Sequence, residues 1–594
     1  MELILKLTGC STPEEVDSEE VERLSALLSS PLKINMAGMH EIASSGLLTR
    51  YQMASLADYR SRHGDVMSYS ELAALDGFGA DFTSAAAPFL SLVSKNGISG
   101  PGRTSASGDI AFRSGVRASP AAAPADGVWP ETLDWSYGMK FRVSSGRGIN
   151  CSAGFSNEYS FEKGFPSAFT GSFAADFRKI CGTVIIGDFN ARFGQGLALW
   201  NGMTMGALGA PSSFMRRPQG LSSSWSYTGN MAHTGAAAEF SAGHFCISAF
   251  AGMPGLKKSA YGRSEVSLLA GVNAAWHCRS GQISVMHYGE TEEIFSGNQT
   301  RISDMKTSAD MAFCFKGTDV FSEFAFDWAS FSPAVLAGTV FRVREDVRLS
   351  AMARYYSPGY NGSRSGAACS TSSCKNECGL SLAGEFNAGK WIALRGRQGF
   401  GSSRRRHSGT FSVDAALFPS GKLKNMSNNM QVQLRVQTEH MAADWLKFTV
   451  RTVVRYRDWG EPFRGELRTD ISVASGALSA ALRLNAVLCT GLGMLGYAEG
   501  GYRTTRMSVF LRQGFFGIDS WNDRIYVYER DAPGSFVVPA FFGRGLWTSA
   551  VCSWKCTKWM RLYARASCTA YPFMPKEKRK PGNAELRVQC VFKI

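Results

Sequence analysis

Long segments of alternating side chains constrain the fold of this chain more than any other feature. In residues 446–457 the even positions are apolar or threonine, and the odd positions are basic or small. Because successive side chains of a β-strand point to opposite faces, this segment has one apolar face and one charged face. Similar alternation occurs in 137–143, 324–328 and 432–436.

From residue 106 onward, about two dozen such segments of roughly 9–14 residues follow one another between turn signals. Strands in soluble domains average ~5–6 residues, whereas a strand that crosses a bilayer at a tilt needs about 9–11. The segment lengths therefore predict membrane-crossing strands rather than a series of soluble sandwiches.

The composition agrees with a membrane barrel and excludes other classes. Glycine accounts for 63 of 594 residues, aromatic residues for 12% and charged residues for 19%, against ~25% charged in a typical soluble domain. A membrane-spanning helix needs about 18 uninterrupted apolar residues, and the most apolar stretch, 476–494, contains Arg483 and Asn485. We therefore predict a mainly β chain: one large transmembrane antiparallel β-barrel of about 24–26 strands, preceded by a small all-α domain.

The bilayer decides which strand face points outward, because lipid excludes charged side chains. For 446–457 we expect the following orientations: Leu446, Phe448, Val450, Val454 and Tyr456 toward lipid, and Lys447, Arg451, Arg455 and Arg457 toward the lumen. Residues 584–594 also alternate, with an aromatic residue, Phe592, two positions from the end. This segment looks like the C-terminal strand of Gram-negative outer-membrane proteins. We therefore expect a bacterial outer-membrane protein in contact with lipid, with both termini on the periplasmic side because the strand number is even.

Charge is divided unevenly along the chain. Residues 1–30 hold two basic and seven acidic side chains, and residues 31–95 have a net charge of −1. Since the whole chain carries +15, residues 96–594 carry +21. We expect an acidic N-terminal segment (1–30), a helical domain (31–95), a Gly/Ser/Pro linker (96–105) and the barrel (106–594).

The first ten residues lack the hydrophobic core of a secretory signal. Residues 7–10 resemble a bacterial lipobox, but a start site placed too far downstream, or a sequence trimmed at its N-terminus, explains the missing signal more simply.

Residues 31–95 contain two short motifs in order. The first runs from 34–37 (Ile-Asn-Met-Ala) to 58–60 (Asp-Tyr-Arg), and the second from 68–72 to 75–79 (Leu-Asp-Gly-Phe-Gly). This order is similar to the tandem helix-hairpin-helix (HhH) module of ComEA-type DNA-binding proteins. In that family a glycine hairpin lets backbone N–H groups approach a DNA phosphate, which implies phosphate contacts at Gly77, Phe78 and Gly79.

Two departures from the family pattern weigh against strong DNA binding. Leu47, Leu48 and Thr49 replace the glycines of the first hairpin, and Asp76 and Asp81 flank the second. Carboxylates beside a phosphate site repel the ligand. We therefore expect a module that binds a periplasmic protein, with nucleic acid as the less favoured partner.

Further motifs extend the resemblance from about residue 31 to the end. They are Gly187-Asp188, Phe193-Gly194-Gln195-Gly196-Leu197, Trp200-Asn201-Gly202, Arg216-Arg217 with Gly220-Leu221, Arg524-Ile525-Tyr526-Val527-Tyr528-Glu529 and Val538-Pro539-Ala540-Phe541-Phe542-Gly543. Together they make the chain similar to a family of bacterial outer-membrane β-barrels that carry a ComEA-like HhH domain. The resemblance implies a periplasmic N-terminal domain and fixes architecture better than chemistry.

No catalytic, metal or cofactor motif stands out, so we expect a protein that is not an enzyme and holds no cofactor. The sequence contains no G-x-S-x-G nucleophile elbow, and His40-Glu41 lacks the second histidine of a zinc protease. Cys369, Cys374 and Cys378 gather in a polar segment, where a disulfide fits an oxidising compartment. Zinc is not favoured there, because the C-x2-C spacing and a local histidine are missing.

The candidate functional residues lie in one non-alternating segment and on the predicted lumen face. Residues 194–221 are too long for an ordinary loop and include Gln195, Trp200, Arg216 and Arg217. Two interpretations stay open for this segment, an extracellular cap and an inward-folded constriction.

Arg451 and Arg455 are the pore candidates on the strands, because a basic lumen favours anions. We therefore predict a channel or transport component with a periplasmic HhH interaction domain. The alternative is a DNA-uptake protein that uses the ComEA-like domain.

Overall fold

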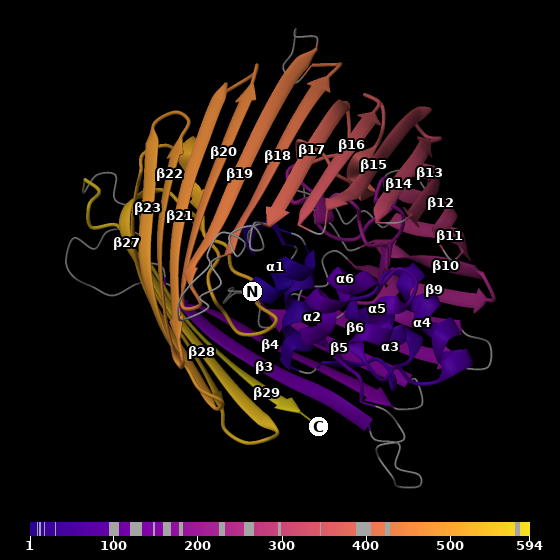
Figure 1. The fold of residues 1–594 in the computed structure, drawn as a ribbon, viewed down its shortest axis with the longest axis horizontal. Coiled ribbons are helices and arrows are strands. Elements are labelled where there is room, and N and C mark those ends of the chain that lie inside the picture. Colours follow the sequence, from indigo (N-terminus) through magenta and orange to yellow (C-terminus); the bar gives the residue numbers. More distant parts are fainter. Residues whose placement is uncertain are drawn as a thin grey trace, which may run out of the picture.

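The computed structural model shows a closed β-barrel that surrounds a helical N-terminal domain (Figure 1). It describes residues 1–8, 10, 13–16, 18–29, 31–93, 106–118, 133–145, 149–157, 168–177, 182–224, 232–254, 267–278, 280–294, 299–315, 317–344, 346–387, 406–421, 428–575 and 582–593. The predicted linker 96–105 lies outside these residues.

Twenty-four strands of the described chain form the wall of the barrel, and every neighbouring pair is antiparallel. The first twelve are β3 (Ala106–Ala118), β4 (Leu133–Ser145), β5 (Ile149–Asn157), β6 (Ala168–Phe177), β7 (Gly182–Arg192), β9 (His233–Ala242), β10 (Phe245–Pro254), β11 (Ser267–Cys278), β12 (Gly281–Ile294), β13 (Gln299–Phe315), β14 (Thr318–Asp327) and β15 (Ser332–Arg344). The other twelve are β16 (Val347–Tyr356), β17 (Glu377–Asn387), β18 (Arg406–Phe418), β19 (Asn429–Ala443), β20 (Leu446–Arg457), β21 (Phe463–Ser475), β22 (Leu478–Leu488), β23 (Leu492–Arg503), β24 (Met507–Ile518), β27 (Gly543–Lys555), β28 (Met560–Ala570) and β29 (Asn583–Lys593).

Pairing of β29 with β3 closes the ring, so the predicted strand number and barrel class are confirmed. Closure matters because an open edge cannot satisfy its backbone hydrogen bonds in lipid. Two strands exceed the predicted length, β13 with 17 residues and β19 with 15.

The outer face of the wall is apolar and the inner face is polar. On β22, Leu478, Leu482, Leu484 and Leu488 are exposed on the outside, whereas Asn485 on the opposite face is buried. Most of the apolar stretch noted in the sequence, 476–494, is thus strand β22, whose alternate residues face lipid and the lumen.

The predicted orientation of β20 is also confirmed. Val450 and Tyr456 are 40% and 48% exposed on the outer face. Arg451, on the other face, forms an ion pair with Glu15 of the N-terminal domain.

The two ends of the barrel differ in their connections. Residues 106 and 593 lie at one end, where most turns are short, such as 243–244, 444–445 and 476–477. The long connections 193–219, 357–376 and 519–542 belong to the opposite end. One long connection at the short-turn end, 388–405, lies outside the described residues.

The N-terminal domain (residues 1–93) consists of short helices around a small apolar core. Its elements are α1 (Glu2–Thr8), η1 (Pro13–Glu15), α2 (Ser18–Ser29), β1 (Leu32–Lys33), α3 (Met39–Ser45), α4 (Arg50–His63), α5 (Tyr69–Ala74), α6 (Gly79–Ala86), η2 (Ala87–Phe89) and β2 (Leu90–Ser91). The parallel pair β1–β2 joins the start and end of the four helices α3 to α6. None of the described helices is long and apolar enough to cross a membrane.

Residues 39–86 form two consecutive helix pairs, α3 with α4 and α5 with α6. The capping boxes at Thr49 and Ser68 start α4 and α5, because each side chain and the glutamine or glutamate three residues later satisfy free backbone N–H groups. Gly77 has φ +82° between α5 and α6, and a Cβ there would strike the ring of Tyr51. Glycine is therefore required at the second hairpin for packing as well as for conformation.

The N-terminal domain lies against the inner face of the barrel. In Figure 1 its indigo helices lie within the outline of the strands, and its residues contact inward-facing side chains of β19 to β22. The sequence predicted a separate domain in the periplasm. Its acidic surface and the basic lumen explain the position seen here, because opposite charges attract most strongly where water is scarce.

Candidate functional site

Residues 193–219, called the insert below, leave the barrel wall and fold into the lumen. β7 pairs with β9 only as far as Phe189, opposite His233. Beyond that point β7 pairs with the short strand β8 (Gly220–Ser223), which carries the chain back to the wall. The segment is therefore folded into the lumen, as in the second of the two interpretations, and is not an extracellular cap.

A buried carboxylate holds the first turn of the insert. Glu323 of β14 points inward and accepts hydrogen bonds from the backbone N–H groups of Gln195, Leu197 and Ala198, at 2.6, 3.0 and 3.2 Å. Gly194, with φ +55°, lets the backbone come this close, because a Cβ there would lie 2.6 Å from the carboxylate. The turn is an anion-binding nest of N–H groups whose anion is supplied by the wall.

The predicted residues Gln195, Trp200 and Arg216 meet within the insert. The side chain of Gln195 accepts a hydrogen bond from the backbone N–H of Arg216 at 2.9 Å. The guanidinium of Arg216 stacks on Trp200, 4.5 Å from the ring centroid, and donates to carbonyl oxygens of Met203 and Gly366. Arg216 thus fixes the insert to a second inward-folded connection.

That second connection, residues 357–376, covers the insert from the same end of the barrel. Tyr360 donates to the carbonyl of Leu197 at 2.8 Å, and Gly206 forms an isolated bridge with Cys369. Both segments bury apolar side chains in one core with the inner faces of the β9–β17 wall.

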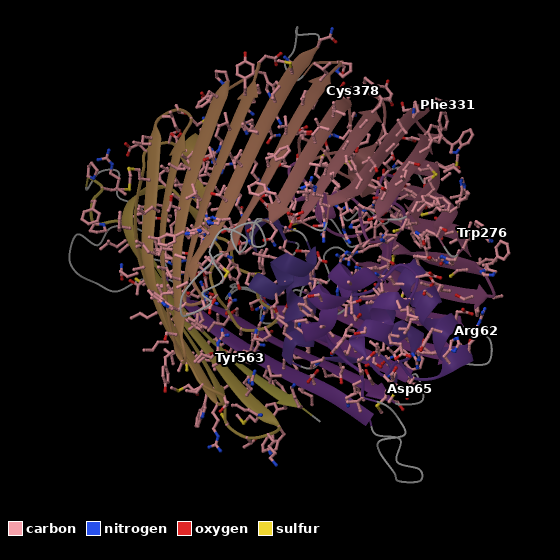
Figure 2. All side chains as sticks on the ribbon, viewed as in Figure 1. Arg62, Asp65, Trp276, Phe331, Cys378 and Tyr563 are labelled. Atoms are coloured by element: carbon pink, nitrogen blue, oxygen red, sulfur yellow. The ribbon has the colours of Figure 1, made fainter. Side chains whose placement is uncertain are left out.

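The fold keeps two of the three cysteines singled out in the sequence, Cys369 and Cys374, in contact and places the third apart. Cys369 and Cys374 are buried free thiols in the connection 357–376, and Cys378 is a free thiol exposed on the outer face of β17 (Figure 2). A disulfide that includes Cys378 is therefore excluded by its position. The described residues contain no group of three or more His, Cys, Asp and Glu side chains that could hold a metal ion.

Arg217 joins the insert to the N-terminal domain. Its guanidinium donates to the carbonyl of Leu7 at 2.7 Å and lies 5.2 Å from the ring centroid of Phe82 on α6. Burial lowers the pKa of Arg217 from its ordinary value. Gln219 adds a hydrogen bond to the carbonyl of Gly46 at 3.2 Å.

Four inward-facing arginines on adjacent strands form what we call the arginine ladder. They are Arg435 on β19, Arg451 on β20, Arg468 on β21 and Arg483 on β22. Arg451 and Arg468 lie directly opposite each other in the strand register. All four are near the middle of their strands, so the ladder lies at mid-depth in the lumen.

Glu14 and Glu15 of η1 bind this ladder. Glu15 pairs with Arg435 at 2.6 Å and with Arg451 at 3.6 Å. Glu14 pairs with Arg483 at 3.5 Å and with Arg468 at 3.6 Å, and it also accepts the backbone N–H of Tyr528 at 3.0 Å.

The environment of Glu14 favours its charged form. Burial raises the pKa of this carboxyl, but the guanidinium groups of Arg468 and Arg483 outweigh that effect and bring its pKa below the ordinary 4.5. Wall residues Glu466 and Asp470 also pair with the ladder. The four arginines of the ladder and the two wall carboxylates together carry a net charge of +2. Glu14 and Glu15 neutralise this charge.

The other predicted site residues form fewer contacts with the N-terminal domain or the insert. Arg455 lies on the lumen face of β20, half-buried, opposite Arg464, and its Nε has no hydrogen-bond partner in the described part of the chain. Gly77 and Gly79 are exposed, whereas Phe78 is buried in the core of the N-terminal domain. Asp76 is exposed beside this hairpin.

Sequence reasoning found Arg451 and the basic lumen but missed Glu14 and Glu15 as partners of the ladder. The available signal was the charge contrast between the acidic residues 1–30 and the basic barrel, which have charges of opposite sign. Charge totals do not reveal which acidic residue meets which arginine.

No family model and no curated protein matches this chain. Among solved structures, the siderophore receptor PirA from Pseudomonas aeruginosa is 8% identical, with a TM-score of 0.40 over 83% of this chain and 81% of that chain. The P pilus usher (PapC) translocation pore is 10% identical, with a TM-score of 0.35 over 82% and 99%. A BenF-like porin from Pseudomonas fluorescens Pf-5 is 9% identical, with a TM-score of 0.30 over 82% and 99%. These weak likenesses transfer no function to this chain.

Proposed function

We propose that this protein is an outer-membrane channel or transport component whose lumen is filled, at rest, by its own N-terminal domain. The observation that carries the proposal is the closed 24-strand wall with an apolar outer face and a charged inner face. Barrels of 16–18 strands already enclose an aqueous channel, so a wall of this size surrounds a wide lumen. A transport role explains why a wide barrel is filled by a separate N-terminal domain, which can move out of the lumen, rather than being built with fewer strands.

In this proposal the short-turn end of the barrel faces the periplasm, as is usual for outer-membrane barrels. The N-terminal domain is then reached from that side and binds a periplasmic protein. Most residues of 61–70 are exposed, including Met67 at 70% and Tyr69 at 38%, whereas Val66 is buried, and this exposure supports a partner surface. Figure 2 shows Arg62 and Asp65 at the edge of the helical domain.

DNA uptake, the alternative drawn from the HhH resemblance, is less well supported. Gly77 and Gly79 have the positive φ values that such a hairpin needs, and both are exposed. The exposed carboxylate of Asp76 stands beside them and disfavours phosphate.

Conductance of the full chain in planar bilayers, with and without mild urea, tests the channel proposal. The barrel wall satisfies its hydrogen bonds internally and resists denaturant, whereas the small core of the N-terminal domain unfolds first. We expect few openings in buffer, large conductance steps in urea, and closure when urea is removed. Absence of steps under both conditions would overturn a channel.

A further inference from the structure

The arginine ladder concentrates positive charge at one depth of the lumen. Neighbouring strands lie about 4.8 Å apart, so the four guanidinium groups at one depth form a row across four strands, in which the wall carboxylates Glu466 and Asp470 also lie. Like charges directly opposite each other, as at Arg451 and Arg468, destabilise a sheet unless anions lie between them. Glu466 and Asp470 offset only two of the four positive charges, so the row keeps a net charge of +2 that requires further anions.

Glu14 and Glu15 meet this requirement as a pair of adjacent carboxylates. Each carboxylate spans two neighbouring arginines, Glu15 on β19 and β20 and Glu14 on β21 and β22. The short helix η1 thus places one carboxylate against the pair β19–β20 and the other against the adjacent pair β21–β22. This geometry is that of a small molecule with two or more anionic groups.

The fit of the carboxylates is incomplete. Arg435 Nε and Arg451 Nε are buried without a hydrogen-bond partner among the described residues, and Arg451 Nη1 reaches Glu15 only at 3.6 Å, too far for a hydrogen bond. Unfilled guanidinium donors are costly when buried. A group with more acceptor oxygens, such as phosphate, would engage donors that Glu15 leaves unused.

We propose that the arginine ladder is the binding site for the transported solute, a small polyanion with two or more phosphate or carboxylate groups, and that Glu14 and Glu15 occupy it in the resting state. This inference rests on the proposed channel function. Binding of a polyanion at the ladder displaces η1 and loosens the N-terminal domain. The lumen thereby opens to the class of solute that competes with Glu14 and Glu15 for the arginines.

The test compares full-length variants in planar bilayers at neutral pH. Glu14→Gln/Glu15→Gln removes the internal anions, and we expect its open probability to rise about tenfold or more over the wild type, since unpaired buried charges release the docked segment. The current should be anion-selective. Asp58→Asn/Asp76→Asn is the matched control, because it removes the same charge from exposed positions of the same domain and should stay closed.

The ligand is tested with inorganic tripolyphosphate and with citrate, and glucose serves as the neutral control. Either polyanion should open the wild type and raise hydrogen exchange in residues 1–29, and should instead reduce the current of Glu14→Gln/Glu15→Gln. Tripolyphosphate acting more strongly than citrate would assign phosphate as the preferred group.

Three results would overturn the inference while leaving the urea-opened channel intact. They are a closed double variant with unchanged exchange in residues 1–29, equal opening by the Asp58/Asp76 control, and no effect of either polyanion. A response to a thymidine oligonucleotide but to neither small polyanion would also overturn it, in favour of nucleic acid as cargo.

Discussion

Glu323 is the residue on which the inward position of the insert depends most. It is 1% exposed, and it accepts three backbone N–H groups that have no helix or strand to satisfy them. A charge buried this deeply is stable only when fully hydrogen-bonded. The nest and the carboxylate therefore need each other.

Glu323→Ala should free the first turn of the insert. Each buried N–H left without a partner costs about 1–3 kcal/mol, so we expect faster hydrogen exchange at Gln195, Leu197 and Ala198. Glu239→Ala is the control, because Glu239 is a lumen-facing carboxylate that bonds Ser248 on the wall. Unchanged protection of the three amides in Glu323→Ala would contradict the role assigned to this carboxylate.

The insert also shows what a sequence can reveal about single residues. Gln195, Trp200, Arg216 and Arg217 were predicted as one site because 194–221 breaks the alternation that surrounds it. Glu323, next to the alternating segment 324–328, was not singled out. Its partner Gln195 lies 128 residues away in the chain, and no local pattern connects them.

At the scale of elements, the three-residue helix η1 forms ion pairs with four arginines of the wall. The groups that face Glu14 are Arg468 and Arg483, with Asp470 between these two arginines and the backbone of Tyr528 above. Because the pKa of Glu14 in the folded protein lies below 4.5, its charge stabilises docking fully above that value. This stabilisation is lost as the pH falls through the folded pKa.

Acidification should therefore weaken docking of the N-terminal domain. We expect the urea concentration that opens the pore to stay constant from neutral pH to about pH 5 and to fall as the pH passes below about 4.5. In Glu14→Gln the midpoint should be lower at neutral pH, and this part of the pH dependence should disappear. A midpoint that rises on acidification would be inconsistent with the ion pairs of Glu14.

The elements themselves were predictable to different degrees. The wall strands follow from local alternation, and α4 and α5 follow from Thr49 and Ser68 as capping residues. The position of the N-terminal domain was not predictable, because docking joins residues hundreds of positions apart. Glu14 and the N–H of Tyr528, 514 residues apart, are an example.

At the scale of the whole molecule, the strand number and the connections define an orientation. Twenty-four strands return the chain to the end where it entered, so residues 106 and 593 share the short-turn end with the turn at 476–477. The turn at 458–462 belongs to the opposite end, together with the insert and the connection 357–376. Outer-membrane barrels keep short turns in the periplasm and longer connections outside.

Epitope tags at two matched glycines test this orientation in cells. Gly460 and Gly476 both occupy turns and have nearly equal positive φ values, 61° and 56°, so insertion after either should disturb the fold similarly. We expect a tag after Gly460 to bind antibody on intact cells. A tag after Gly476 should bind only after the outer membrane is permeabilised.

The opposite labelling pattern would invert the barrel and place the N-terminal domain within reach of the outside. Polyanions would then meet the arginine ladder from the short-turn end before crossing the membrane, rather than after passing the insert. The tags therefore decide from which side the domain that fills the lumen is displaced. They also decide whether Arg216 and Arg217, which hold the insert, lie before or behind the ladder on the path of a solute that enters from outside.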